Sequence, residues 1–272
     1  MTDPLLHFKN PPVIETVLGV QFDPIPGLGA AHLGEFWHHL GPEWPQVIDA
    51  PALDPQYETF GEETPWGSAF AGIRIEEKLS IRIQYKNEQG DRMIQVQNGR
   101  FHFNWLGGKG PQYPRYTTIR PDFDRYWSRF QDYLIEKELG KPSVNQWEIT
   151  YVNHIPQGKL WASPGDWQRI LRIPAPSCVI SGLSFERLDG NWHYEIKPQK
   201  GRLHLTVQHV KSKAPEQAEV LRVTLTARGP VSSGSDVENS LDDGLSLGRE
   251  TIVRTFCDLT TETAHKEWGV IE

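Results

Sequence analysis

A serine between two glycines is the first feature of this sequence whose spacing could do chemistry. Gly244-Leu245-Ser246-Leu247-Gly248 matches the G-x-S-x-G nucleophile elbow of serine hydrolases, which needs a strand before the serine and a helix after it. Here the motif lies inside a run whose apolar residues Leu241, Leu245 and Ile252 recur at helical spacing. We therefore interpret the two glycines as small residues that let a helix pack closely, and we predict no nucleophile at Ser246.

The spacing of residues also argues against a dinucleotide-binding loop and against a metal site. Gly27-Leu28-Gly29 precedes a helical stretch like a dinucleotide-binding loop, but His32 occupies the third glycine position and the following strands form antiparallel hairpins. The ten histidines are scattered, and the two cysteines, Cys178 and Cys257, lie far apart without zinc-site spacing. The sequence therefore predicts no cofactor and no metal.

Carboxylates and imidazoles on strand-like stretches are the remaining candidates for acid–base chemistry. Glu15, Glu148, His154 and His204 each stand in an alternating run, on the side opposite to the apolar residues. A carboxylate and an imidazole on one face can share a proton-transfer task. An enzyme that uses these four residues is one alternative; the lack of any recognisable catalytic constellation favours a non-catalytic role.

The chain is organised around its first predicted strand, residues 13–22. Pro11 and Pro12 prevent a helix before it, and the apolar residues then alternate with polar ones at every second position. Residues 146–155 repeat this pattern, again with a glutamate near the start and a proline at the end. One buried face and one polar face are typical of strands in an antiparallel sheet.

The remaining elements follow the same order after each of these two strands. Asn98-Gly99 and Asp189-Gly190 predict hairpin turns, and residues 43–55, with three prolines, predict a surface connection. In the first half we expect helices at residues 28–40 and from Pro121 to about 139, with strands at 57–62, 68–75, 79–86, 92–97 and 100–106. In the second half we expect helices at residues 161–173 and after Asp236, with strands at 178–188, 191–197, 202–210 and 220–228.

These elements predict an α+β fold built from two β-α-β(4)-α halves, residues 1–142 and 143–272, fused as one compact domain. Two such halves join into one curved antiparallel sheet with helices on a single face. The TATA-binding-protein type of fold has this layout. The likeness is one of architecture and carries no function with it.

Composition and charge restrict the class of protein and the cellular compartment that we expect. The chain has 272 residues and a formal net charge of −7, which disfavours a general nucleic-acid coat. The two cysteines lie beside apolar residues and predict reduced, buried thiols. Residues 1–7 lack a basic region and a long apolar run, so we expect no signal peptide, no membrane span and a cytoplasmic protein.

Three motifs together resemble a sporadically distributed prokaryotic family of about this length, which has no established activity. The motifs are Asn10-Pro11-Pro12-Val13-Ile14-Glu15, Tyr151-Val152-Asn153-x-Ile155, and Ile252-Val253-x-x-Phe256-x-x-Leu259-Thr260 followed by His265-x-x-Trp268-Gly269. They span nearly the whole chain. Relatives often have a histidine where this chain has Arg249, so the resemblance assigns that position no role.

The most concrete candidate for a binding site is the polar face of the predicted sheet. We expect this face to be exposed and to hold a protein partner or a second copy of the chain. An edge strand of the sheet could bind such a partner instead of the face. Nucleic-acid or nucleotide binding through its arginines is the alternative, which the acidity of the chain disfavours. Glu15 and Glu148 can pair there with Arg82 and Arg222. The candidate binding residues are Glu15, Arg74, Arg82, Glu148, Asn153, His154, Arg222 and Arg228. Gln21, His204 and Gln208 share the predicted face.

Overall fold

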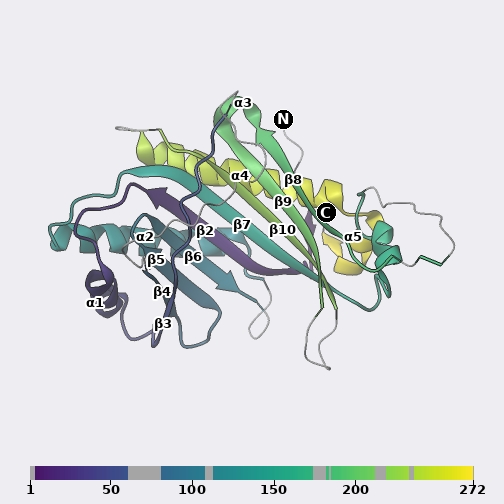
Figure 1. The fold of residues 1–272 in the computed structure, drawn as a ribbon, viewed down its shortest axis with the longest axis horizontal. Helices are drawn as coiled ribbons and strands as arrows, with labels where there is room; N and C mark the ends of the chain where they lie inside the picture. The colour runs from purple at the N-terminus through teal and green to yellow at the C-terminus, as the bar shows by residue number, and fades with distance from the viewer. Residues whose placement is uncertain are drawn as a thin grey trace.

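The computed structural model describes residues 4–60, 81–107, 113–173, 182–183, 185–211, 219–232 and 236–271. Within these residues, nine strands form one antiparallel sheet in the order β3-β4-β5-β6-β2-β7-β10-β9-β8 (Figure 1). The mixed α+β class and the large antiparallel sheet predicted from the sequence are thus confirmed.

The strands of the large sheet have the following bounds: β2 Val13–Phe22, β3 Gln46–Pro51, β4 Ile81–Lys86, β5 Arg92–Gln97, β6 Arg100–Leu106, β7 Val144–Pro156, β8 Asp189–Ile196, β9 Gly201–Val210 and β10 Val220–Pro230. The helices are α1 Ala30–Leu40, α2 Tyr116–Glu136, the 3-10 helix η2 Pro164–Arg169, the single turn α3 Lys197–Lys200, α4 Val237–Leu259 and α5 Glu262–Trp268. Two short strands, β1 His7–Phe8 and β11 Val270–Ile271, pair with each other.

Strands β2 and β7 lie side by side at the centre of the sheet. Leu18 is directly opposite Ile149 and Val20 opposite Trp147, so the apolar sides of both strands point to the same face. On that face Phe22 contacts Trp127 of α2, and Trp147 packs against α4. Both long helices therefore cover one face of the sheet, as Figure 1 shows. The other face carries the polar residues of each strand.

The two ends of the described chain meet beside this sheet. The Lys9 amide donates to the Gly269 carbonyl (2.7 Å) and the Asn10 amide to the Trp268 carbonyl (2.9 Å). The ring of Phe8 lies edge-on to that of Trp268, with the centroids 5.5 Å apart. The opening motif and the C-terminal motif of the sequence thus form one structural unit.

Several predicted boundaries are wrong, each for a local reason. Helix α2 begins at Tyr116, five residues before Pro121, because the proline loses only one main-chain hydrogen bond close to the helix start. Residues 46–51 form edge strand β3, where Pro51 needs no ladder partner on its free side. Asp189 and Gly190 lie within β8 and make no hairpin turn.

Other expected elements are shorter or lie elsewhere. The helix expected at residues 161–173 is the 3-10 helix η2, which starts at Pro164. Residues 57–60 form no strand, because side chains from the sheet occupy their main-chain groups, as described below. The expected strand at 68–75 lies outside the described residues, as does Cys178. The strand expected at 178–188 is wrong where it is described, because residues 182–183 and 185–188 form no strand. After β7 the described part of the second half therefore adds three strands to the large sheet, β8, β9 and β10, where four were expected. The Cys257 thiol is free and buried, as predicted.

Candidate functional site

The polar face of the sheet is covered by the chain itself. After β3, residues 52–60 run in an extended path across this face (Figure 1), and we call them the covering segment. Beneath it the polar side chains of the central strands are almost fully buried, including Gln21, Gln146 and Glu148 at 3–6% exposure. The expectation of an openly exposed polar face is therefore wrong at its centre.

Two glutamines bind the main chain of the covering segment through both ends of their amide groups. Gln97 of β5 accepts from the Leu53 amide and donates to the Leu53 carbonyl, both at 2.8 Å. Gln21 of β2 accepts from the Gln56 amide (3.1 Å) and donates to the Gln56 carbonyl (2.6 Å). Paired bonds of this kind satisfy the backbone in the way a neighbouring strand would.

A third glutamine, on the next strand, extends the same arrangement. Gln146 of β7 accepts from the Glu58 amide (3.1 Å) and donates to the Gln56 carbonyl (2.7 Å). Gln146 lies directly opposite Gln21 in the sheet, so the two side chains converge on one carbonyl. Because all six bonds go to main-chain atoms, this contact does not depend on the side chains of the bound segment.

One side chain of the covering segment is held by charge. The Glu58 carboxylate lies 2.6 Å from Arg202 Nη1, 2.9 Å from Arg228 Nε and 2.6 Å from His204 Nε2. Burial alone would raise the pKa of Glu58, but the hydrogen bond and charge of His204 together with the two guanidinium groups lower it to about 2. Arg202, Arg228 and His204 thus form a carboxylate socket, the name used below.

A second buried cluster lies next to the socket. Arg228 Nη1 is also 3.3 Å from Glu148 Oε2, and His102 Nε2 lies 3.4 Å from Glu148 Oε1. The His102 ring passes directly over Gly19, where a Cβ would come within 2.3 Å of the ring. A glycine at position 19 is therefore required for His102 to reach the cluster. Glu148 pairs with Arg228, directly opposite on β10, and its expected pairing with Arg222 is wrong.

The buried histidine makes stability depend on pH. Burial, aided by nearby arginines and opposed by Glu148, lowers the pKa of His102 from 6.5 to about 4. Between these values the unfolded chain binds a proton that the folded chain does not, so stability falls as pH falls from 6.5 to 4. We expect His102 to contribute roughly 2–3 kcal/mol to this loss. Urea unfolding at several pH values should show a shallower pH dependence for His102→Gln than for the parent protein. An unchanged dependence would contradict the assignment.

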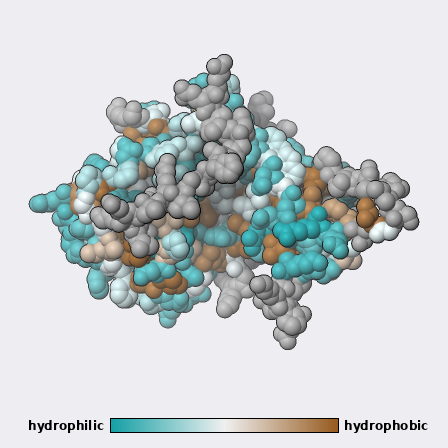
Figure 2. Space-filling model, viewed as in Figure 1, coloured by the Kyte–Doolittle hydropathy of each residue, from teal (hydrophilic) through white to brown (hydrophobic). Residues whose placement is uncertain are grey.

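The other predicted residues lie apart from the covering segment. Glu15 accepts from Asn104 Nδ2 at 2.6 Å, so its expected pairing with Arg82 is wrong, and burial raises its pKa. Arg222 Nε donates to His154 Nε2 at 3.1 Å. Figure 2 shows hydrophilic surface over the part of the sheet where β7 and β10 lie in Figure 1. Arg74 lies outside the described residues.

Asn153 does not belong to the polar face. It follows Tyr151 at the spacing of one strand face and lines a cavity on the helix-covered side. Its Nδ2 donates to the Val223 carbonyl (3.2 Å). Asn153 was named as a candidate binding residue, and its position in the alternation of β7 places it on the apolar side, apart from the polar face.

The glycines around Ser246 have the packing role predicted for them. They lie within α4, and a Cβ at Gly244 would come within 2.2 Å of the Trp147 indole, one at Gly248 within 2.7 Å. Ser246 faces outward and is exposed. Ser246 lies in the middle of helix α4, and a nucleophile elbow needs its serine at a turn between a strand and a helix. Ser246 therefore does not have the geometry of a nucleophile elbow.

Comparison with known proteins assigns the chain to no group. No protein-family model matches it, and no curated protein matches it either. Among the described residues no helix is long and apolar enough to cross a membrane, and within the same residues no three His, Cys, Asp or Glu side chains gather as metal ligands would. The resemblance to a sporadically distributed prokaryotic family stays a prediction.

Proposed function

We propose that this protein is a non-catalytic binding module that holds an extended polypeptide against the polar face of its sheet. The observation that carries the proposal is the set of three glutamines, each of which accepts from one main-chain N–H group and donates to one main-chain carbonyl of the covering segment. The sheet is thereby already shaped to hold one extended strand. A protein partner would present such a strand in place of residues 52–60.

The carboxylate socket supplies the specificity that main-chain bonds lack. Arg202 and Arg228 are both buried, and an unpaired buried charge is costly, so a segment without an acidic side chain at this position would bind poorly. The preferred partner is therefore an extended segment with a Glu at the place of Glu58. Nucleic-acid binding finds less support, because these two arginines are already engaged by carboxylates.

We further propose that the layout arose by duplication of a β-α-β(4)-α unit, as in the TATA-binding-protein type of fold. The strand order supports this, since β2 and β7 stand at the centre and in each half a long helix on the same face follows the strands of the large sheet. The binding face then draws on both halves, with Gln97 and Gln21 from the first half and Gln146 and the socket from the second.

A peptide supplied in trans tests the binding function. In the full-length Glu58→Lys variant the lysine confronts Arg202 and Arg228, so the covering segment should leave the face. A fluorescein-labelled peptide of residues 50–60 should then bind with micromolar affinity, measured by fluorescence anisotropy. The parent protein should bind it at least about 30-fold more weakly, because its own segment competes at a high effective concentration.

Two controls sharpen this experiment. The same peptide with glutamine in place of Glu58 should bind Glu58→Lys at least about 10-fold more weakly, since the socket loses its anion. The variant Glu267→Lys, which reverses a charge in an exposed pair with Lys159, should behave like the parent. A folded Glu58→Lys variant that ignores the peptide would refute the proposal. Leu53→Pro removes the N–H group that donates to Gln97, so this variant should also release the covering segment.

A further inference from the structure

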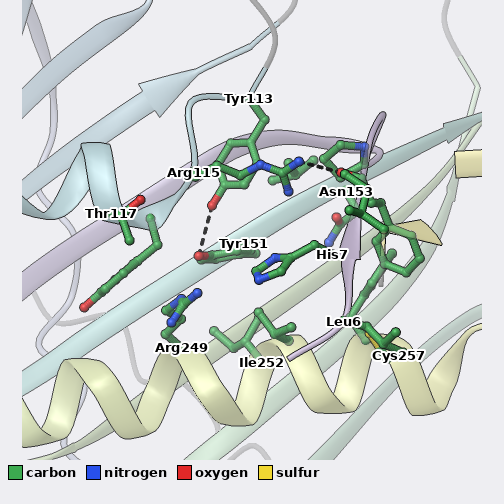
Figure 3. A pocket seen from close by; sticks show the side chains of 17 residues that line it. Leu6, His7, Tyr113, Arg115, Thr117, Tyr151, Asn153, Arg249, Ile252 and Cys257 are labelled. Atoms are coloured by element: carbon green, nitrogen blue, oxygen red, sulfur yellow. Dashed lines mark hydrogen bonds between the residues drawn. The ribbon is translucent and has the colours of Figure 1, made fainter. Parts of the chain in front are cut away.

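A cavity of about 410 Å³ lies on the helix-covered side of the sheet, opposite to the covering segment. Figure 3 shows the side chains that line it. It is bounded by β7, by α4, by the start of α2 and by the N-terminal residues around β1. Its walls are mainly apolar, from residues such as Phe8, Val13, Ile252, Val253 and Phe256. Both the volume and the lining fall in the range of small-molecule sites, about 300–1,000 Å³.

Two guanidinium groups line this apolar cavity. The Arg249 guanidinium lies over the Tyr116 ring, 4.9 Å from its centroid, and Arg115 Nη2 donates to the Phe8 carbonyl at 2.7 Å. Within the described part of the chain neither group forms an ion pair, and no Asp or Glu lines the cavity. The third basic side chain, His7, has its pKa lowered by burial and by these two arginines, so it stays neutral at neutral pH.

A pair of tyrosine hydroxyls adds a neutral donor to the same place. Tyr113 Oη and Tyr151 Oη are 3.1 Å apart, so one hydroxyl donates to the other and one hydrogen is left for a further acceptor. Burial raises the pKa of both phenols, which keeps both protons in place. Figure 3 shows Arg249 pointing from α4 toward the Tyr151 hydroxyl. Positive charge and a hydroxyl donor therefore converge on one end of an apolar space.

We propose that this cavity binds a small hydrophobic carboxylate, either an acyl chain or an aromatic acid. A carboxylate would neutralise Arg249, with Arg115 as a second cation, and could accept the remaining tyrosine hydrogen. The hydrocarbon part would cover the apolar walls and remove them from water. A neutral ligand would leave the guanidinium charge without an anion, and a cationic ligand would be repelled.

Isothermal titration with defined probes tests this inference. Decanoate and 2-naphthoate represent the aliphatic and the aromatic source, and decanol is the neutral counterpart. We expect saturable micromolar binding of at least one of the two acids, with decanol at least about 10-fold weaker than decanoate if the acyl chain is the ligand. The acid that binds more tightly shows whether the natural ligand is an acyl chain or an aromatic acid. If neither acid binds at concentrations up to about 1 mM, the inference is overturned.

Variants on α4 locate the site. Arg249→Gln should weaken the bound acid at least about 10-fold and leave decanol unaffected, because only the charge contact is lost. The matched control is Arg254→Gln, on the same helix, whose guanidinium pairs with Glu250. It should change nothing. Val253→Trp, which fills the cavity, should abolish binding of every probe. Unchanged acid affinity in Arg249→Gln or in Val253→Trp would overturn the inference, and thermal unfolding verifies that each variant is folded.

Discussion

Arg228→Met is expected to lower the free energy of unfolding by roughly 3–5 kcal/mol and to free the covering segment. The Arg228 guanidinium contacts two carboxylates at once, Glu58 of the segment and Glu148 of β7, and it also donates to the Gln56 side chain. Removing one partner of a buried pair costs much more than the pair contributes, because the remaining charge is left buried. Here two carboxylates lose their shared cation.

Urea denaturation and limited proteolysis measure the two parts of this prediction. Cleavage within residues 52–60 should become faster than in the parent, since the segment loses its main anchor. The matched control is Arg222→Met on the same strand, where the arginine is half-buried and donates to His154. It should cost less than about 1 kcal/mol. Equal losses for both variants would show that the socket does not hold the segment.

Trp147→Ala should destabilise the protein by a similar amount, about 3–5 kcal/mol. The indole of Trp147 is 1% exposed and fills the space between the sheet and α4. Four glycines approach it closely: Gly201, Gly229, Gly244 and Gly248. Because these four residues have no side chains, they cannot fill the void that alanine leaves.

The control for this substitution is Trp192→Ala on edge strand β8. Trp192 is only partly buried, so its removal should cost less than half as much. Urea unfolding of both variants gives the comparison. A loss below about 1.5 kcal/mol for Trp147→Ala would mean that α4 can collapse onto β7, which contradicts the packing described here.

The sequence predicted the elements better than it predicted how they meet. Period-two alternation located β2, β7, β9 and β10, because each has one apolar face against the helices. The Asn98-Gly99 turn was predicted from its two residues alone, and it joins β5 to β6 as expected. The boundary near Pro121 was wrong because a proline is tolerated close to a helix start, and that near Asp189 was wrong because Asp189 and Gly190 pair with β9.

The centre of the candidate site was only partly predictable. Alternation placed Gln21, Glu148, His204 and Arg228 on the polar face, and the structure brings them together. Glu58 could not be found in this way. It lies in residues 57–62, which were expected to form a strand, and its charged partners Arg202 and His204 are more than 140 positions away along the chain. The burial of the face follows from this contact together with the glutamine contacts to Leu53, Gln56 and Glu58.

Amide hydrogen exchange at Leu53, Gln56 and Glu58 tests most directly whether the polar face holds an extended polypeptide. These residues lie outside any helix or strand, so without the glutamine contacts their amides would exchange at unprotected rates. We predict protection of at least about 100-fold at all three, and loss of protection at Glu58 when Gln146 is replaced by methionine. Unprotected exchange at all three amides in the parent protein would contradict the account.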